Sequence, residues 1–244
     1  MKNIGFIILF FVGLGCFAQD SDPIITDRPT QSAASTVVPL GTAIIEYGFI
    51  HETAGDVSNT TFANLHARVG LLKFAELRVT QNILSTKNDL TDESESGFSP
   101  LTLGTKMHLF KENGAIPQMS IIGQVTLDNG DEAFKPGETI PEVRLNFSNT
   151  LSNSWSLGYN IGMAFPEDNT TTIYTAVIGY AFSPGWTAFA EPYGFFYEDE
   201  SDHRFNAGLI YLLKSNLQFD VSAGVGLSDI SPDSFIGFGA AWGF

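Results

Sequence analysis

The sequence contains little cysteine, no long apolar run beyond its start, and few basic residues. Its one cysteine is Cys16, so the rest of the chain is expected to have no disulfide, no thiol catalysis and no cysteine metal site. No stretch after residue 18 approaches about eighteen consecutive apolar residues, which excludes membrane-spanning helices. Lysine and arginine number 12 against 27 acidic residues. This imbalance argues against nucleic-acid binding, which needs basic patches that neutralise phosphate.

The first 18 residues predict a secretory signal peptide. Lys2 precedes an apolar run over residues 4–14, and small residues follow, ending in Ala18. This three-part pattern predicts cleavage after Ala18. The apolar run is too short to span a bilayer as a helix. Lipid attachment at Cys16 is the other alternative, but Gly13 stands where such motifs normally have leucine.

The last eleven residues predict a strand that faces lipid on one side. From residue 236 onward, apolar or aromatic residues alternate with small ones, and the last residue is aromatic. Successive side chains of a strand point to opposite faces, so one face is apolar and the other nearly bare. This ending resembles the closing strand of bacterial outer-membrane barrels. The predicted lipid-facing residues are Ile236, Phe238, Trp242 and Phe244, with Phe244 at the membrane interface.

Twelve segments have strand character: 42–52, 61–71, 74–84, 100–110, 116–127, 140–150, 154–165, 171–182, 186–197, 204–212, 216–227 and 234–244. Their length suits the roughly 9–11 residues with which a tilted strand crosses a membrane. Short and long connections alternate, the long ones covering 53–60, 85–99, 128–139, 166–170, 198–203 and 228–233. This is the layout of outer-membrane barrels, and an even number of strands returns both ends to the periplasm.

The predicted fold class is therefore all-β, a single antiparallel up-and-down transmembrane β-barrel of about 12 strands over residues 41–244, with both termini periplasmic. Residues 19–40 form an N-terminal periplasmic or plug segment. A soluble sandwich would place its polar face outside and would not need so many strands of membrane-crossing length. The expected location is the cell outer membrane.

Most acidic residues fall in the long connections. Solvation of surface loops explains most of this pattern, and divalent cations that bridge the loops to lipopolysaccharide are the alternative. The acidic stretch 128–132 does not fit the spaced calcium-loop pattern. We predict no metal site and no cofactor. The expected partners are outer-membrane lipids and lipopolysaccharide, the barrel-assembly machinery and a small-molecule solute.

Alternation also predicts a polar set that faces the lumen: Glu46, His66, Arg68, Glu76, Arg78, Lys106, His108, Glu142, Arg144, Glu191, Arg204 and Asp220. A charged side chain on the lipid face would cost about 2–4 kcal/mol near mid-membrane. Two interpretations remain open. The charges pair across the lumen and hold the barrel in shape, or they line a path and discriminate solutes by charge. Twelve strands predict a lumen between a packed interior and a wide aqueous channel.

No catalytic residues are predicted. Lipid-hydrolysing barrels carry a histidine and a serine side by side on the outer face, whereas His66 and His108 are expected to face inward. The sequence has no nucleophile elbow, no metal-binding histidine pair and no glycine-rich phosphate loop. We therefore do not expect an enzyme.

Three early stretches are distinctive: residues 25–32 read ITDRPTQS, 37–41 read VVPLG and 44–49 read IIEYGF. They resemble the opening of the family called "putative MetA-pathway of phenol degradation", and the similarity continues through 77–79, 99–106, 141–144, 156–160 and 203–220. The resemblance implies an outer-membrane barrel that passes small organic compounds. It does not establish phenol as a substrate.

The segment Asp27, Arg28 and Pro29 precedes the first strand, and its proline fixes the backbone and removes a donor. It is either a periplasmic lead-in or a short plug whose charges pair with lumen residues such as Arg78 or Glu142. We expect a channel or transporter for small organic solutes through a narrow charged lumen. The alternative is a non-conducting structural or surface-interaction barrel in which the lumen charges are fully paired.

Overall fold

The computed structural model describes residues 22–244, so the predicted signal peptide over residues 1–18 lies outside the described residues. Within 22–244 there is no helix of the length and apolar character needed to cross a membrane. The strands are β1 (Ala43–Ala54), β2 (Val57–Leu72), β3 (Ala75–Asn88), β4 (Glu93–Phe98), β5 (Thr102–Phe110), β6 (Gln118–Thr126), β7 (Ile140–Thr150), β8 (Trp155–Ala164), β9 (Thr171–Ser183), β10 (Trp186–Phe196), β11 (Ser201–Lys214), β12 (Leu217–Gly226) and β13 (Ser234–Gly243).

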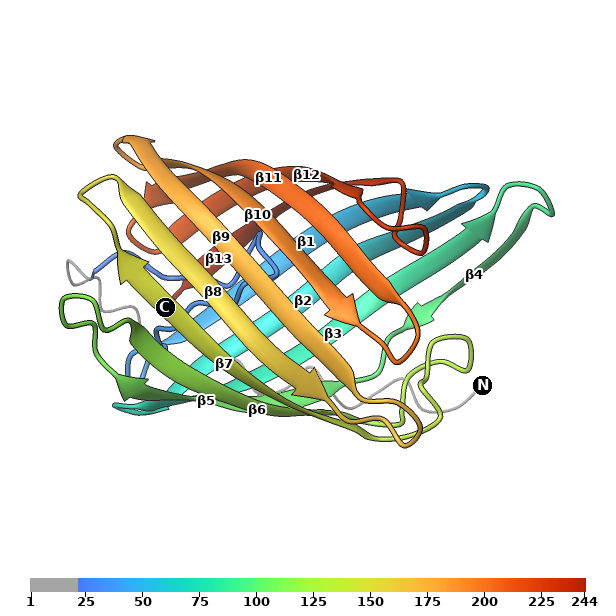
Figure 1. Cartoon of the computed structure of the whole chain (residues 1–244), viewed down its shortest axis with the longest axis horizontal. Coiled ribbons are helices and arrows are strands. Elements are labelled where there is room, and N and C mark those ends of the chain that lie inside the picture. The colour runs from blue at the N-terminus through green and yellow to red at the C-terminus, as the bar shows by residue number, and fades with distance from the viewer. Residues whose placement is uncertain (1–21) are drawn as a thin grey trace.

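The strands form one closed antiparallel barrel (Figure 1). Sequence neighbours pair from β1 to β3 and from β5 to β13, and β5 also pairs with β3. Pairing of β1 with β13, from Ile44↔Gly243 to Thr53↔Ser234, closes the ring. Closure removes the free sheet edges that a lipid environment cannot satisfy. The predicted barrel of twelve strands is thus confirmed, with β4 as one additional strand.

Strands β4 and β5 pair with the same strand, β3, one after the other along its length. On β3, the last residue paired with β5 is Thr80 and the first paired with β4 is Ile83, three residues later. Their partners, Thr102 of β5 and Phe98 of β4, are four residues apart. The break therefore inserts one extra residue, as a bulge does. Pro100 lies in this break, where its missing N–H breaks no ladder bond. The connection predicted over 85–99 thus contains a strand.

The two ends of the barrel have different connections. We call the end with the brief turns after β2, β7, β9 and β11 the short-turn end, and the other the long-loop end. The longest connections of the long-loop end are 127–139 and 227–233. One connection there is much shorter than the predicted 53–60, because β1 and β2 meet in a tight turn at Gly55, with φ at 55°. Beyond the lipid both strand faces meet water, so alternation disappears although the pairing continues.

The outer face of the barrel is apolar. Ile236, Phe238 and Trp242 each expose more than half of their surface, at 53%, 51% and 55%. At the short-turn end the ring centroids of Trp155 and Tyr180 lie 4.5 Å apart. Those of Trp186 and Tyr211 lie 4.4 Å apart. Aromatic girdles of this kind mark the membrane interfaces of outer-membrane barrels.

Deletion of Phe244 is expected to reduce the yield of assembled barrel several-fold. Ala43 N donates to Phe244 O at 2.8 Å, and Phe244 N donates to Ala43 O at 3.0 Å, so the residue completes the closing seam. Its ring also packs edge-on against Trp242, with centroids 5.3 Å apart. The measurement is the heat-modifiable fraction on a denaturing gel after folding into liposomes. Asp168→Asn, in the exposed loop after β8, is the control, and equal yields for both variants would contradict the argument.

Candidate functional site

Residues 24–40 form a loop inside the barrel, which we call the N-terminal arch. It enters at the short-turn end, where Ile24 N donates to Ser215 O at 2.7 Å. Gln31, at its apex, accepts a hydrogen bond from Arg144 of β7 at 3.2 Å. The arch then returns to the short-turn end beside β2. Its hydrogen bonds reach β1–β3 and β5–β12, so it occupies the lumen rather than lying outside the barrel.

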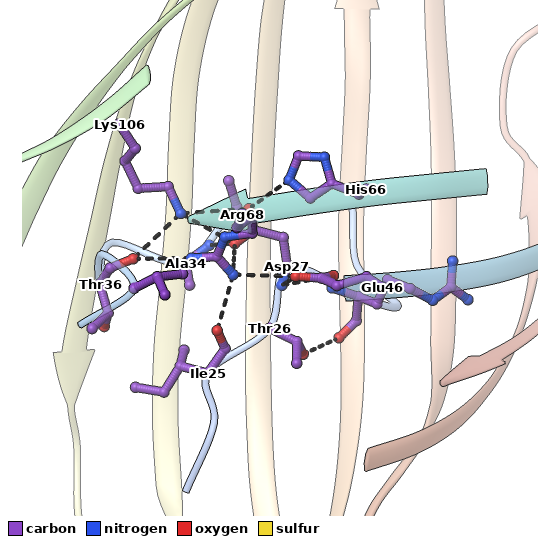
Figure 2. Close-up of polar contacts among 12 residues, drawn as sticks. Ile25, Thr26, Asp27, Ala34, Thr36, Glu46, His66, Arg68 and Lys106 are labelled. Atoms are coloured by element: carbon purple, nitrogen blue, oxygen red, sulfur yellow. Dashed lines mark hydrogen bonds and ion pairs between the residues drawn. The ribbon is translucent and has the colours of Figure 1, made fainter. Parts of the chain in front are cut away.

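A buried ion-pair network surrounds Asp27 of the arch (Figure 2). Arg78 Nη1 lies 2.6 Å from Asp27 Oδ2, and Lys106 Nζ lies 3.2 Å from Asp27 Oδ1. Arg68 Nη1 lies 3.5 Å from Asp27 Oδ1. We call the six members Asp27, Glu46, Arg68, Glu76, Arg78 and Lys106 the Asp27 cluster. Three carboxylates thus meet three cations, which balances the formal charge.

Arg68 lies at the centre of the Asp27 cluster and is fully buried. Its Nε donates to Glu76 at 2.9 Å, and its Nη1 donates to Glu46 at 3.2 Å. Nη1 also donates to the carbonyl of Ile25 in the arch at 2.9 Å. Buried ion pairs persist where such hydrogen bonds satisfy both partners. The guanidinium therefore joins the wall strands to the arch.

Burial opposes ionisation of Asp27, but Arg68, Lys106 and Arg78 outweigh burial and hold the pKa of this carboxyl well below its usual range. An opposite charge within a few ångströms favours the charged form of a carboxyl group. Asp27 is therefore ionised at neutral pH. The arch thus contributes one of the three negative charges that neutralise the cations of the wall.

Wall carboxylates also accept hydrogen bonds from the arch backbone. Glu46 accepts from Arg28 N at 3.0 Å, and Glu76 accepts from Val38 N at 2.6 Å. Glu191 accepts from Ser32 N at 2.7 Å and from the preceding amide at 2.9 Å. A carboxylate bonded to backbone N–H groups is a charge-assisted hydrogen bond, roughly twice as strong as a neutral one. These residues hold the arch in one conformation.

Arg28 lies across the closing seam of the barrel. Its Nη2 bonds Asp220 Oδ1 of β12 at 2.9 Å. The guanidinium rests against Gly48 of β1 and Gly239 of β13, which are paired in register. A Cβ at either glycine would overlap the guanidinium of Arg28. The bare positions noted in the closing strand therefore make room for an arch side chain.

The other residues of the predicted lumen set lie outside the Asp27 cluster. Arg144 pairs with Glu142 at 2.9 Å, two residues away on β7. Arg204 pairs with Glu52 at 3.0 Å and with Asp202. The structure thus adds Glu52 and Asp202 to the set; the alternation of Asp202 with Arg204 along β11 is the signal that could have found the second.

The two histidines of the lumen set have different surroundings. His66 Nδ1 lies 2.6 Å from Thr80 Oγ1, and its Nε2 lies 3.9 Å from Asp27. His108 is half-buried on β5 and pairs in register with Ser120 of β6. Within residues 22–244, no group of three or more histidine, aspartate or glutamate side chains is placed to hold a metal ion.

Gly48→Ala is expected to expel Arg28 from its place on the seam and to loosen the arch. The three atoms nearest to the new Cβ all belong to the guanidinium of Arg28. Losing a buried hydrogen bond between charged groups costs about 1.5–3 kcal/mol, roughly tenfold or more in the population of the loosened arch. The measurement is the maleimide labelling rate of Ala33→Cys, a buried arch position, with and without Gly48→Ala.

Gly123→Ala is the matched control, because a Cβ there meets nothing within 4 Å. It should leave the labelling rate of Ala33→Cys unchanged. If Gly48→Ala labels no faster than Gly123→Ala, the guanidinium of Arg28 does not hold the arch.

Two of the spaces that the described residues leave open lie against the strands of the barrel. The larger, about 530 Å³, lies between the arch and the wall strands β7–β12 at the short-turn end. The smaller, about 280 Å³, lies near the long-loop end, between Glu52, Thr60 and Phe134 of the connection after β6. The arch lines only the first of these spaces.

The comparisons with known proteins agree with this architecture. The sequence profile of the family described as "Putative MetA-pathway of phenol degradation" matches residues 26–244. Comparison with curated protein sequences gave no match. The solved COG4313 outer membrane channel from Pseudomonas putida F1 aligns with a TM-score of 0.71, at 13% identity, over 88% of this chain and 100% of its own.

Two porins have the same kind of barrel. The KdgM porin aligns with a TM-score of 0.57, at 14% identity, over 82% of this chain and 99% of its own. The NanC porin aligns with a TM-score of 0.59, at 6% identity, over 81% of this chain and 98% of its own. At these identities the likeness shows a common fold, that of outer-membrane barrels.

Proposed function

The chain belongs to the family described as "Putative MetA-pathway of phenol degradation", and from this membership and its barrel we propose that it is an outer-membrane channel for small organic solutes. The short-turn end, where residue 22 and Phe244 lie, faces the periplasm in this proposal, because outer-membrane barrels have their short turns there. The long loops and their acidic side chains face outward, toward lipopolysaccharide.

One observation carries the proposal: the side chains of the barrel and the arch do not fill the lumen. Barrels of eight strands enclose little more than packed side chains. Here, even with the arch inside, a space of about 530 Å³ remains against the wall. A purely structural barrel gains nothing from an unfilled interior, since unfilled space forfeits packing contacts.

The lumen charges divide into two groups with different proposed roles. Arg68, Arg78 and Lys106 are buried and bonded to the arch, so we assign them to anchoring it. The side chains of Arg144 and Arg204 remain 15% and 20% exposed. These two are the cations that a passing solute would meet, and they give the lumen its charged character.

A non-conducting barrel is the second candidate function. It is favoured by the pairing of the predicted lumen cations, each of which contacts at least one carboxylate. Under this alternative the ion pairs hold the shape of the barrel, and the outer loops serve adhesion or envelope integrity.

The deciding experiment is solute flux through the purified, reconstituted protein. Liposome swelling is measured with a panel of sugars, amino acids and aromatic acids, together with conductance in planar bilayers. We expect selective passage of small solutes at a low conductance. If neither the intact chain nor a chain without residues 19–40 passes any member of the panel, the structural alternative replaces the channel.

A further inference from the structure

The space of about 530 Å³ at the short-turn end has an apolar wall. Val177 and Ala181 of β9 and Phe189 of β10 line it, followed by Ile210 and Leu212 of β11. In a barrel whose interior is water-filled, the inward positions are normally polar. Here one sector of the lumen wall is apolar although it does not face lipid.

The direction of these side chains follows from their neighbours along the same strands. Thr175 of β9 accepts a hydrogen bond from Ser32 of the arch at 2.7 Å, so its side chain points inward. Side chains two apart share a face, which places Val177 and Ala181 on the lumen side. Asn206 of β11 reaches Glu191 and the arch in the same way. On β11 the inward face therefore changes toward the short-turn end, from charged and polar residues to Ile210 and Leu212.

The arch does not cover this apolar sector. Around its apex the arch borders the space with the small side chains of residues 32–35, two serines and two alanines, which leave it empty. Ligand sites in proteins commonly enclose roughly 300–1,000 Å³ of mostly apolar wall with a few placed polar groups. Ser156, Ser183 and Thr187 of the wall supply such polar groups, together with Gln218 and the hydroxyl groups of the arch.

Charge is absent from the lining except at Arg28, which is bonded to Asp220. The three cations of the Asp27 cluster lie on the opposite wall, on β2, β3 and β5, and are paired with carboxylates there. An ionised solute would lose hydration in this space and find no free counter-charge. An uncharged solute would lose little and would cover the apolar wall.

We propose that this space is a binding chamber for an uncharged, largely apolar small molecule with one hydrogen-bonding group. The proposal rests on the channel function and names its solute class. In this proposal the charged side chains of β2, β3 and β5 anchor the arch, and the apolar side chains of β9–β11 select the solute.

The test uses three probes of similar size and different charge: benzyl alcohol, benzoate and benzylammonium. Binding to the intact folded protein in detergent is measured by isothermal titration calorimetry, with protein-free micelles as the blank. We expect benzyl alcohol to bind at least tenfold more tightly than either ion. Glucose, uncharged but fully polar, should bind no better than the ions. Equal binding of all three aromatic probes, or glucose binding as tightly as benzyl alcohol, would overturn the proposal.

Two variants locate the binding. Ala181→Trp fills the chamber and should weaken benzyl alcohol binding at least tenfold. Ala176→Phe, on the same strand but on the lipid face, adds apolar bulk outside the chamber and should leave binding unchanged. Both must show the gel mobility shift of the intact barrel. Unchanged binding in Ala181→Trp would place the probe elsewhere and end the proposal.

Flux separates this proposal from the channel function. Binding of benzyl alcohol without passage of any solute would leave the chamber standing and remove the channel. Passage of solutes irrespective of charge, unaffected by Ala181→Trp, would leave the channel standing and remove the chamber.

Discussion

Deletion of residues 22–40 is expected to raise the single-channel conductance in planar bilayers several-fold. The arch crosses the lumen and bonds to strands on opposite sides of it, including β3, β8 and β12. Strand β1 begins only at Ala43, so the deletion leaves the closed ring intact. Arg68, Glu46 and Glu76 still bond to one another without the arch, so the wall keeps its pairing.

A disulfide crosslink that fixes the arch to the barrel wall is the control for its deletion. Ser35 Oγ of the arch and Ser148 Oγ of β7 lie 2.6 Å apart, close enough for a disulfide to replace them. Because the rest of the described chain contains no cysteine, Ser35→Cys/Ser148→Cys pairs without competition. The oxidised protein should conduct no more than the unmodified one, and reduction should restore its original level. A truncated barrel that conducts no more than the intact one would show that the arch does not limit flow.

The barrel and its polar interior could be predicted because alternation records which side of each strand meets lipid. Lipid excludes charge, so Glu46, Arg68 and Glu76 read as inward from sequence alone, and the structure buries all three. The same signal fails beyond the lipid. Strand β4 and the hairpin at Gly55 were not predicted, because both of their faces contact water and their residues do not alternate. Pro100 also separates β4 from β5.

The arrangement inside the lumen could not be predicted in the same way. Alternation predicts which face of the strand a side chain lies on. It does not predict its position along the barrel axis or its partner across the lumen. Arg28 contacts Asp220, 192 residues later, and this pairing depends on the stagger of twelve strands. The apolar wall did leave a signal: around Val177 and Ile210 both faces of β9 and β11 are apolar, which alternation with a polar lumen does not explain.

Arg68→Met is expected to destabilise the barrel more than any other single substitution of a lumen charge. The guanidinium is the shared partner of Glu46 and Glu76, and all three side chains are fully buried. It also contacts Asp27, whose side chain is 12% exposed. Removing one member of a buried ionic network costs about 3–5 kcal/mol, because the remaining charges stay buried without compensation. The arch should also loosen, since Arg68 donates to the carbonyl of Ile25. The measurement is the concentration of guanidinium chloride at which half of the folded band on a gel is lost.

Lys87→Met removes a cation of the same sign from an exposed pair. Lys87 and Asp89 have side chains that are 48% and 60% exposed, with the charged atoms 2.9 Å apart. Exposed pairs contribute little to stability, because water already solvates both groups. The midpoint of Lys87→Met should therefore stay close to that of the unmodified chain while that of Arg68→Met falls well below it. Equal midpoints would mean that the Asp27 cluster is hydrated rather than buried, and that the arch is held by its backbone contacts to Glu191 and the wall alone.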